Sequence, residues 1–306
     1  MTVSTFKQNI KPWMLPIAML CGIFFHDAIK ALAFLAPWLI FAMLLVTFCK
    51  IRIQEVRLNR MMVYLLAIQL PVAVALYFAV RSFSEVLAQG LFICVFCPTA
   101  TAAPVITQML GGSLPMLVSY SLLSNAAVAI AAPWLFAVMG RGDIPVVEAT
   151  VSIARNVVPL ILGPLVAALL MQRCTPRLHR ALAQRQSISF YLWSLSLIIV
   201  VGRAVSFVMA EPAAAIPLET ALALVALLAC VCQIIAGRRI GAACGDRVAG
   251  AQGLGQKNTV LAIWMALTYL NPLASVAPAA YVLWQNTVNS GQLYFSMRRQ
   301  NHLQKP

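Results

Sequence analysis

The stretch Gln252-Gly-Leu-Gly-Gln-Lys-Asn-Thr259 opens a run that continues without charge from Val260 to Leu270. It places a lysine, two glycines and four amide or hydroxyl side chains at the depth of a membrane span. An ionisable group in hydrocarbon costs about 2.5–3.5 kcal/mol on insertion scales, so it is kept where it faces a cavity, a partner or a substrate. Irregular backbone is restricted in the same way, because its N–H and C=O groups need hydrogen-bond partners. The stretch therefore indicates a functional site inside a membrane.

Apolar residues dominate the rest of the chain and come in blocks long enough to cross a membrane. Of 306 residues, 62% are hydrophobic and only 10% are charged. The blocks have about the length of one membrane-crossing helix, roughly 17–25 residues. We therefore predict an all-α polytopic membrane protein with ten transmembrane helices. The ten predicted spans cover residues 12–26, 31–49, 61–80, 86–110, 114–139, 154–171, 188–207, 214–236, 248–270 and 272–296.

The formal charge of +14 is distributed unevenly between the two sides of the membrane. With ten spans, the side that holds both termini receives Lys7, Lys11, Lys50, Arg52, Arg57, Arg60, Arg173, Arg177, Arg180, Arg185, Arg238, Arg239, Arg247, Arg298, Arg299 and Lys305. The other side receives Lys30, Arg81 and Arg141. By the positive-inside rule, we expect both termini in the cytoplasm of a multi-pass protein of the cell (inner) membrane. The charge thus fits membrane topology, and no nucleic-acid partner is predicted.

No metal or cofactor is predicted from the cysteines. Cys94 and Cys97 form a C-x-x-C pair, but no histidine or second cysteine pair accompanies them at metal-ligand spacing. The other cysteines fall mostly in predicted spans or cytoplasmic loops, where reduced thiols serve as small apolar residues.

The chain divides near residues 141–148 into two parts that each contain five predicted spans. Two copies of a unit with an odd number of spans enter the membrane from opposite faces, which gives an inverted repeat. We therefore predict a first five-helix repeat over residues 1–140 and a second, inverted repeat over 148–300. The fourth span of each repeat is interrupted, and paired interruptions of this kind indicate a binding site at the membrane midplane.

The two interruptions have different chemical causes. In helix 4, Pro98 and Pro104 remove backbone donors and clash with the preceding turn. In helix 9, Gly250, Gly253 and Gly255 each cost about 1 kcal/mol relative to alanine in a helix and permit an unwound segment. The half-helices that follow the interruptions direct their N-terminal ends, which carry partial positive charge, towards one central point. This arrangement favours a bound anion.

Four motifs resemble the bile acid:sodium symporter family in order and spacing. They are Cys97-Pro98-x-x-Thr101-Ala102, Gly255-x-x-Asn258-Thr259-x-Leu261-Ala262, Leu267-Thr-Tyr-Leu-Asn-Pro-Leu-Ala274 and Trp284-x-Asn286. The resemblance extends over nearly the whole chain. It implies broken, crossing helices 4 and 9. It also implies a core domain of helices 3–5 and 8–10 that moves against a panel of helices 1, 2, 6 and 7, with organic anions carried between them.

The resemblance also implies two sodium sites, but the corresponding positions hold other residues. A Ser-Asn pair of helix 4 is replaced by Ala103-Pro104, a glutamate of helix 9 by Gly253 and a glutamine by Lys257. In helix 5, the two hydroxyl positions hold Leu117 and Ser121. A hard cation needs several oxygen ligands and prefers a carboxylate nearby. We therefore do not expect classical two-sodium coupling, and the coupling ion, H⁺ or Na⁺, stays open.

Lys257 has three functional interpretations. Its ammonium can take the place of a bound cation, it can carry a proton, or it can contact an anionic substrate. The alternative is a lysine that extends to the membrane interface. Leu270 is thirteen positions after Lys257 and Arg247 is ten before it, so the residue is deep in the predicted span and we favour a function.

The candidate substrate or ion site contains residues from both interrupted spans and from helix 5. These residues are Thr99, Thr101, Ser121, Gln252, Gln256, Lys257, Asn258 and Thr259. The amides can also cap the half-helices, and threonines in membrane helices often bond to their own backbone. In helix 5, Ser124 and Asn125 lie within one turn of Ser121, so any one of the three can face the crossing.

The favoured function is a secondary active transporter of a small organic anion that works by alternating access. The alternatives are a sodium-coupled bile acid-type symporter and a non-transporting membrane sensor. The longest predicted loop, about 172–187, is too short to form a signalling domain. An enzyme is not expected, because the histidines, His26, His179 and His302, lie in loops or at ends of spans and form no catalytic motif.

Overall fold

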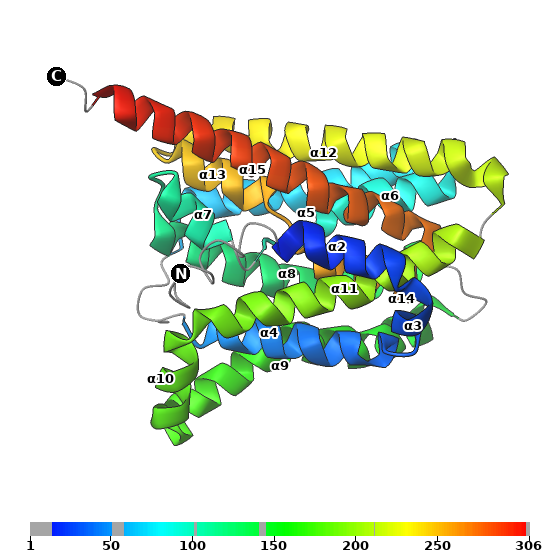
Figure 1. Cartoon of the computed structure of the whole chain (residues 1–306), viewed down its shortest axis with the longest axis horizontal. Coiled ribbons are helices and arrows are strands. Elements are labelled where there is room, and N and C mark those ends of the chain that lie inside the picture. The colour runs from blue at the N-terminus through cyan, green and yellow to red at the C-terminus, as the bar shows by residue number, and fades with distance from the viewer. Residues whose placement is uncertain (1–13, 51–57, 101–102, 141–144, 211, 304–306) are drawn as a thin grey trace. The chain divides into compact units, whose positions relative to one another are not determined.

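The computed structural model describes residues 14–50, 58–100, 103–140, 145–210 and 212–303. Within these residues, every regular element is a helix (Figure 1). Five helical segments are long and apolar enough to cross a membrane: Arg60–Val80, Leu114–Met139, Val146–Cys174, Tyr191–Ala210 and Ala213–Ala243. The prediction of an all-α protein with membrane-spanning helices is therefore confirmed.

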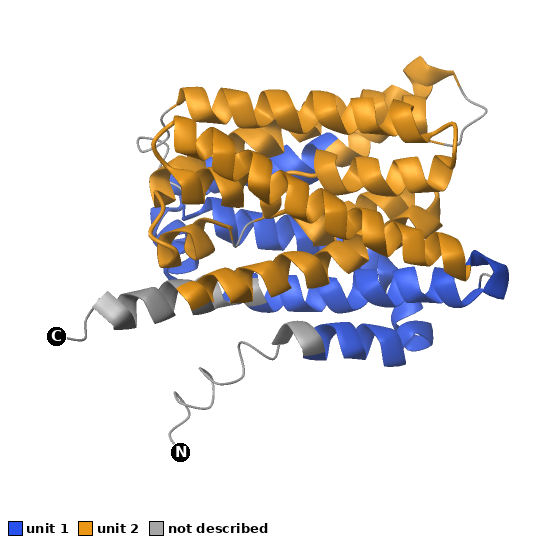
Figure 2. Ribbon diagram, turned by 90° about the horizontal axis from the view of Figure 1, so that it is seen from above, with its two compact units in different colours: residues 1–50, 158–215 blue, residues 51–157, 216–306 orange. Residues whose placement is uncertain are grey.

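The helices group into two compact units, which Figure 2 shows in different colours. Unit 1 contains Met1–Lys50 and Val158–Ala215, and unit 2 contains Ile51–Val157 and Ile216–Pro306. Each unit thus combines an N-terminal part of the chain with a later part. The boundary between the units falls inside one helix, α9 (Val146–Cys174).

In unit 1, the long helix α11 (Gln186–Ala210) packs against the three helices from the N-terminal part of the unit. These are α2 (Met14–Phe24), α3 (His26–Lys30) and α4 (Ala36–Phe48), with the short 3₁₀ turn η2 (Ala33–Leu35) before α4. At the contact of α2 with α11, a Cβ added to Gly22 would lie 3.0 Å from the Ile198 carbonyl oxygen. The small residue therefore lets the two backbones approach closely.

Unit 1 also contains a helix where the sequence analysis expected a loop. The expected loop 172–187 forms the end of α9, the short helix α10 (Pro176–Gln184) and the start of α11. Pro176 occupies the first turn of α10, where its missing N–H is not needed. The loop prediction was wrong because it followed long apolar runs, whereas α10 is a short helix rich in arginine.

Unit 2 contains the interrupted helices and the long helices around them. Its elements are α5 (Arg60–Val80), α6 (Glu85–Phe96), α7 (Ala103–Met109), α8 (Leu114–Met139), the start of α9, α12 (Ile216–Ala243), α13 (Arg247–Gly255), α14 (Thr259–Tyr269), η5 (Pro272–Ser275) and α15 (Val276–Leu303). Helix α12 lies along α13 and also packs against α6 and α15, while α5 packs against α6 (Figure 1). The part of the chain from residue 216 onwards thus supplies helices that pack directly against the helices of residues 60–139.

Polar side chains cap the helix starts in unit 2. Ser84 accepts a hydrogen bond from Leu87 N at the start of α6, and Asp246 accepts one from Ala249 N at the start of α13. Asn258 caps α14 in the same way through Leu261 N. These bonds satisfy N–H groups that have no partner within the helix.

Both spans in which the sequence analysis expected an interruption consist of two helices. Span 86–110 is divided between α6 and α7, and span 248–270 between α13 and α14. Helix α6 ends because Cys97 precedes Pro98, and a residue before proline is driven into an extended conformation; its ψ is 145°. Pro104 does not break a helix, because it lies in the first turn of α7.

The glycines of helix 9 act differently from the expectation that they permit an unwound segment. Gly250, Gly253 and Gly255 all lie within α13, and the extended backbone begins only at Gln256. A Cβ added to Gly255 would lie 2.2 Å from a side-chain carbon of Ile234, and one added to Gly253 would lie 3.1 Å from the Tyr120 ring. Close packing against neighbouring helices therefore explains these glycines, and the interruption itself contains no glycine.

Candidate functional site

The two interruptions meet as a pair of extended backbone segments within unit 2. Thr99 and Lys257 form an isolated antiparallel bridge. On either side of this pair, Ala100 N donates to the Gln256 carbonyl at 2.9 Å, and Asn258 N donates to the Pro98 carbonyl at 2.9 Å. The interrupted backbones thus satisfy part of each other's hydrogen-bonding capacity, as buried irregular backbone requires.

Three side chains from other parts of unit 2 bond to the free carbonyls at the C-terminal end of α6. Gln69 Nε2, from α5, donates to the Phe96 carbonyl at 2.8 Å and to the Cys97 carbonyl at 2.9 Å. Lys257 Nζ donates to the Val95 carbonyl at 2.8 Å, and Gln233 Nε2, from α12, reaches the Cys94 carbonyl at 3.3 Å. These bonds replace the intrahelical partners that the last turn of a helix lacks.

The end of α13 is satisfied in a similar way. Thr99 Oγ1 donates to the Gly253 carbonyl at 2.9 Å, and Tyr281 Oη, from α15, donates to the Gly255 carbonyl at 2.9 Å. Gln285, also from α15, forms hydrogen bonds with both the backbone N–H and the backbone carbonyl of Lys257. Its Oε1 accepts from Lys257 N at 2.9 Å, and its Nε2 donates to Lys257 O at 3.3 Å. Helix α15 therefore fixes the middle of the second interruption.

The ammonium of Lys257 lies at the negative end of a helix. Its backbone precedes the N-terminus of α14, but its Nζ reaches the last turn of α6, where unpaired carbonyls carry partial negative charge. The side chain is 1% exposed, and no carboxylate of the described residues forms an ion pair with it. The sequence predicted that helix N-terminal ends converge at the centre of the site, but Lys257 Nζ bonds to a carbonyl oxygen at a helix C-terminal end.

Two buried amide groups at the crossing have N–H donors without a partner among the described residues. They are Gln256 Nε2 and Asn258 Nδ2, on residues that are 3% and 4% exposed. The orientation of the Asn258 amide is fixed by its Oδ1, which accepts from Leu261 N at 3.3 Å. An unpaired buried donor costs free energy, so these positions favour a water or a ligand that brings acceptor atoms.

The structure brings together most of the site residues that the sequence predicted, but not all. Thr99, Gln256, Lys257 and Asn258 form the crossing, and buried Thr259 begins α14 directly beside it. Thr101 lies outside the described residues.

Within the described residues, the side chains of Gln252 and Ser121 form no hydrogen bond with the crossing residues. Gln252 lies inside α13 and bonds to Gln292 Oε1 of α15 at 2.9 Å instead of reaching the crossing. In α8, Ser124 bonds to the crossing, since its Oγ accepts from Thr99 N at 3.4 Å. Ser121 is 6% exposed in the same helix, and its backbone carbonyl accepts from Asn125 Nδ2. A role of Ser121 in the site stays a prediction.

Sequence reasoning missed Gln69, Gln285 and Tyr281 as parts of the site. Gln69 and Gln285 are 0% and 5% exposed, and each is an amide with apolar residues on its N-terminal side in the same helix. A buried amide in an apolar span needs a polar partner, and this signal was present in the sequence. Tyr281 carries no such signal, because a tyrosine in a membrane helix is equally compatible with packing.

Gln69→Leu is expected to lower the free energy of unfolding of the protein, since Gln69 joins four groups. Besides the carbonyls of α6, its Oε1 accepts from Tyr120 Oη at 2.7 Å and from Ser124 Oγ at 3.2 Å. Each buried group left unpaired costs about 1–3 kcal/mol. Thermal unfolding in detergent measures the effect, and Gln108→Leu, at an exposed position of α7, is the control. Equal melting temperatures for the two variants would contradict the proposed role of Gln69.

The crossing is thus built within unit 2, where α5, α8, α12 and α15 supply polar side chains to the two interruptions. A comparison of the chain with protein-family models finds no match, and a comparison with curated proteins finds none either.

Proposed function

We propose that the protein is a secondary active transporter that moves a small organic anion across the cell (inner) membrane by alternating access. The observation that carries the proposal is the antiparallel pairing of two interrupted helices around a lysine that is 1% exposed. Such interruptions are stable in a membrane only where protein or a cavity surrounds them, and in transporters they hold the substrate and ion sites. In this proposal, ten spans form two inverted repeats, residues 1–140 and 148–300, with both termini in the cytoplasm.

The groups at the crossing favour an anionic substrate. The unpaired atoms of Gln256 and Asn258 are hydrogen-bond donors, and Lys257 supplies a cation on the adjacent residue. The first turn of α14 adds the partial positive charge of a helix N-terminus. A carboxylate offers the acceptor atoms and the negative charge that this set lacks. The size and shape of the rest of the substrate are not fixed by these groups.

The grouping of helices supports alternating access. Alternating access requires two parts that move as bodies around a binding site. Unit 2 contains the predicted spans 3–5 and 8–10, and unit 1 contains the predicted spans 1, 2 and 7 and most of span 6. Unit 2 is the candidate for the core of such a transporter and unit 1 for the panel, and the crossing lies in unit 2.

Uptake of labelled organic acids into proteoliposomes tests the proposal. We expect concentrative uptake of at least one small carboxylate when an ion gradient is imposed, and no uptake into liposomes without the protein. Proton and sodium gradients are imposed separately, so the same experiment identifies the coupling ion. Binding of an organic acid without any translocation would instead indicate a membrane sensor.

Sodium is expected to change substrate binding by less than about tenfold, or roughly 1.4 kcal/mol of coupling. Two of the positions where the resemblance implies sodium ligands are apolar or closely packed. Leu117 is fully buried in an apolar cluster with Leu65 and Tyr120, and a Cβ at Gly253 would lie 3.1 Å from both of these side chains. There is thus neither an oxygen at Leu117 nor room for a carboxylate at Gly253.

Substrate binding measured in sodium, potassium and choline solutions of equal ionic strength checks this prediction. A steep, saturable dependence on sodium, with two ions bound per protein, is the result that would overturn it.

A further inference from the structure

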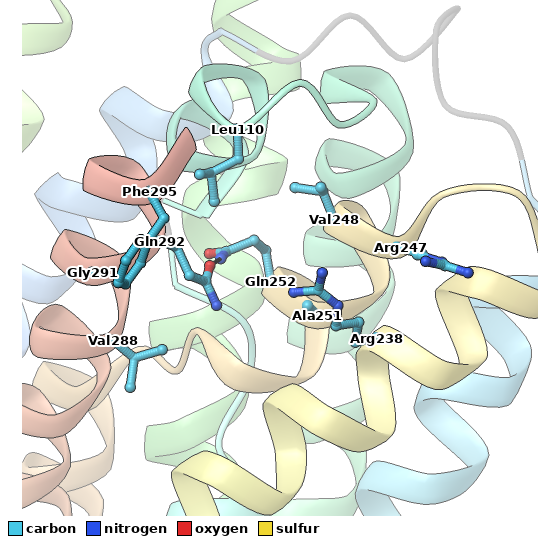
Figure 3. Close-up of a pocket in the computed structure, with 10 residues that line it drawn as sticks. All are labelled: Leu110, Arg238, Arg247, Val248, Ala251, Gln252, Val288, Gly291, Gln292 and Phe295. Carbon is cyan, nitrogen blue, oxygen red and sulfur yellow. Dashed lines mark hydrogen bonds between the residues drawn. The ribbon is translucent and has the colours of Figure 1, made fainter. Parts of the chain in front are cut away.

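A cavity of about 530 Å³ lies in unit 2 and is drawn in Figure 3; Thr99, Gln256, Lys257 and Asn258 of the crossing do not line it. Its walls come from Leu110, directly after α7, and from α12, α13 and α15, and they include Val288 and Phe295 on α15. Pockets for small organic ligands have volumes of about 300–1,000 Å³ and are mostly apolar, with a few polar groups that orient the ligand. The cavity therefore has the size and the apolar surface of a ligand site.

Two arginines on the wall of this cavity lack an acidic partner. Arg238 and Arg247 both line it, and neither forms an ion pair with any described residue. The neighbouring acid, Asp246, is engaged elsewhere, since its carboxylate oxygens accept from Ser113 N at 2.7 Å and from Ala249 N at 2.8 Å. In Figure 3, the guanidinium of Arg238 points towards Gln252, whereas that of Arg247 points away. Arg238 is thus placed to bind an anion inside the cavity.

A buried amide provides a second, independent sign of a ligand. Gln252, which lines the cavity, is 1% exposed and donates through Nε2 to Gln292 at 2.9 Å and to Asn289 at 3.4 Å. Its Oε1 has no partner among the described residues. In this arrangement the unpaired atom of Gln252 is its carbonyl oxygen, which is an acceptor. A buried acceptor of this kind is satisfied by a ligand hydroxyl or N–H.

We infer that this cavity binds an organic acid that carries both an apolar body and a hydroxyl group. The carboxylate of the acid pairs with Arg238, its apolar body packs against Val288 and Phe295, and its hydroxyl donates to Gln252 Oε1. Guanidinium groups bind carboxylates through paired, charge-assisted hydrogen bonds, which makes Arg238 the main source of affinity. This site goes beyond the proposed function, because it is separate from the crossing and does not require transport.

Binding of three related probes to the purified protein in detergent tests the inference by titration calorimetry. The probes are 3-(4-hydroxyphenyl)propanoate, the same acid without its hydroxyl, and the amide of the hydroxylated acid. We expect the hydroxylated acid to bind most tightly. The amide should bind at least about tenfold more weakly than this acid, because it has no charge for Arg238. Equal affinities for the acid and its amide, or no binding of the acid at millimolar concentration, would overturn the inference.

Two variants locate the site. Arg238→Gln is expected to weaken binding of the hydroxylated acid by about tenfold or more, whereas Arg239→Gln should leave it within about twofold. The control removes the same charge from the next residue, which does not line this cavity. Gln252→Leu should remove the preference for the hydroxylated acid and keep the dependence on charge. Equal effects of the two arginine variants would place the anion elsewhere, and this comparison holds even if the Gln252 variant fails to fold. Because no step requires translocation, failure of the uptake experiment leaves this test intact.

Discussion

Lys257→Gln is expected to lower uptake of the transported anion by about tenfold or more, equivalent to roughly 1.4 kcal/mol, and to leave the melting temperature unchanged or raised. The loss of uptake follows from the proposed role of the cation, and the melting temperature follows from its surroundings. Lys257 is 1% exposed and has no carboxylate partner among the described residues. Its Nζ donates a hydrogen bond to the Val95 carbonyl, which is a neutral group. A buried charge without an opposite charge lowers stability, and a neutral side chain of similar size relieves that cost.

Glutamine preserves a donor for the α6 carbonyls while it removes the charge. Loss of transport in a protein that is as stable as the wild type would therefore assign Lys257 to the transport process. Uptake into proteoliposomes from about pH 5 to 9, at equal protein content, provides the measurement, and a loss of pH dependence in the variant would identify Lys257 as the proton carrier. Arg239→Gln, which removes a cation from an exposed position, is the control.

Two outcomes would exclude this role. Unchanged uptake with an unchanged pH profile would make Lys257 a structural residue. A large drop in the melting temperature would show that the ammonium stabilises the end of α6 more than its burial costs.

Gly250→Ala is expected to destabilise the protein by about 1–3 kcal/mol or more, although the change adds a single methyl group. A Cβ at Gly250 would lie 2.2 Å from the Gly237 carbonyl oxygen and 2.7 Å from Gly241 Cα, both on α12. These are backbone atoms, so no side-chain rotation relieves the clash, and α12 must separate from α13. The same conclusion holds in reverse for Gly237→Ala, whose Cβ would lie 2.2 Å from the Gly250 carbonyl oxygen.

Thermal unfolding in detergent measures this effect. The matched control is Gly291→Ala in helix α15, where an added Cβ meets no atom within 4 Å. Alanine is favoured over glycine in a helix by about 1 kcal/mol, so the control should melt at the same temperature or higher. If Gly250→Ala melted like the control, the close approach of α12 and α13 would not exist in the folded protein.

The sequence by itself determined the class of protein and the location of both interruptions. Apolar blocks of membrane-spanning length are a property of composition along the chain, and they predicted an all-helical membrane protein. The end of α6 follows from Pro98, which forces Cys97 into an extended conformation. The prediction that Lys257 has a function follows from the cost of a charge at membrane depth. All three inferences need only the local sequence and its surrounding solvent.

Only the tertiary structure decided how the interruptions are satisfied. Gln69 and Gln285 bond to the broken helices because packing brings α5 and α15 next to them. Packing also assigns the glycines of α13 to helix contacts and brings Ser124 next to Thr99.

The direction of the Lys257 side chain depends on the same long-range packing. Its bond joins residues 162 positions apart, from Nζ to the Val95 carbonyl at the end of another helix. A local pattern shows that a buried backbone group or charge needs a partner, because that need arises from its own desolvation. Which partner it obtains depends on how distant helices pack, and this is why the sequence located the crossing but left most of its hydrogen bonds undetermined.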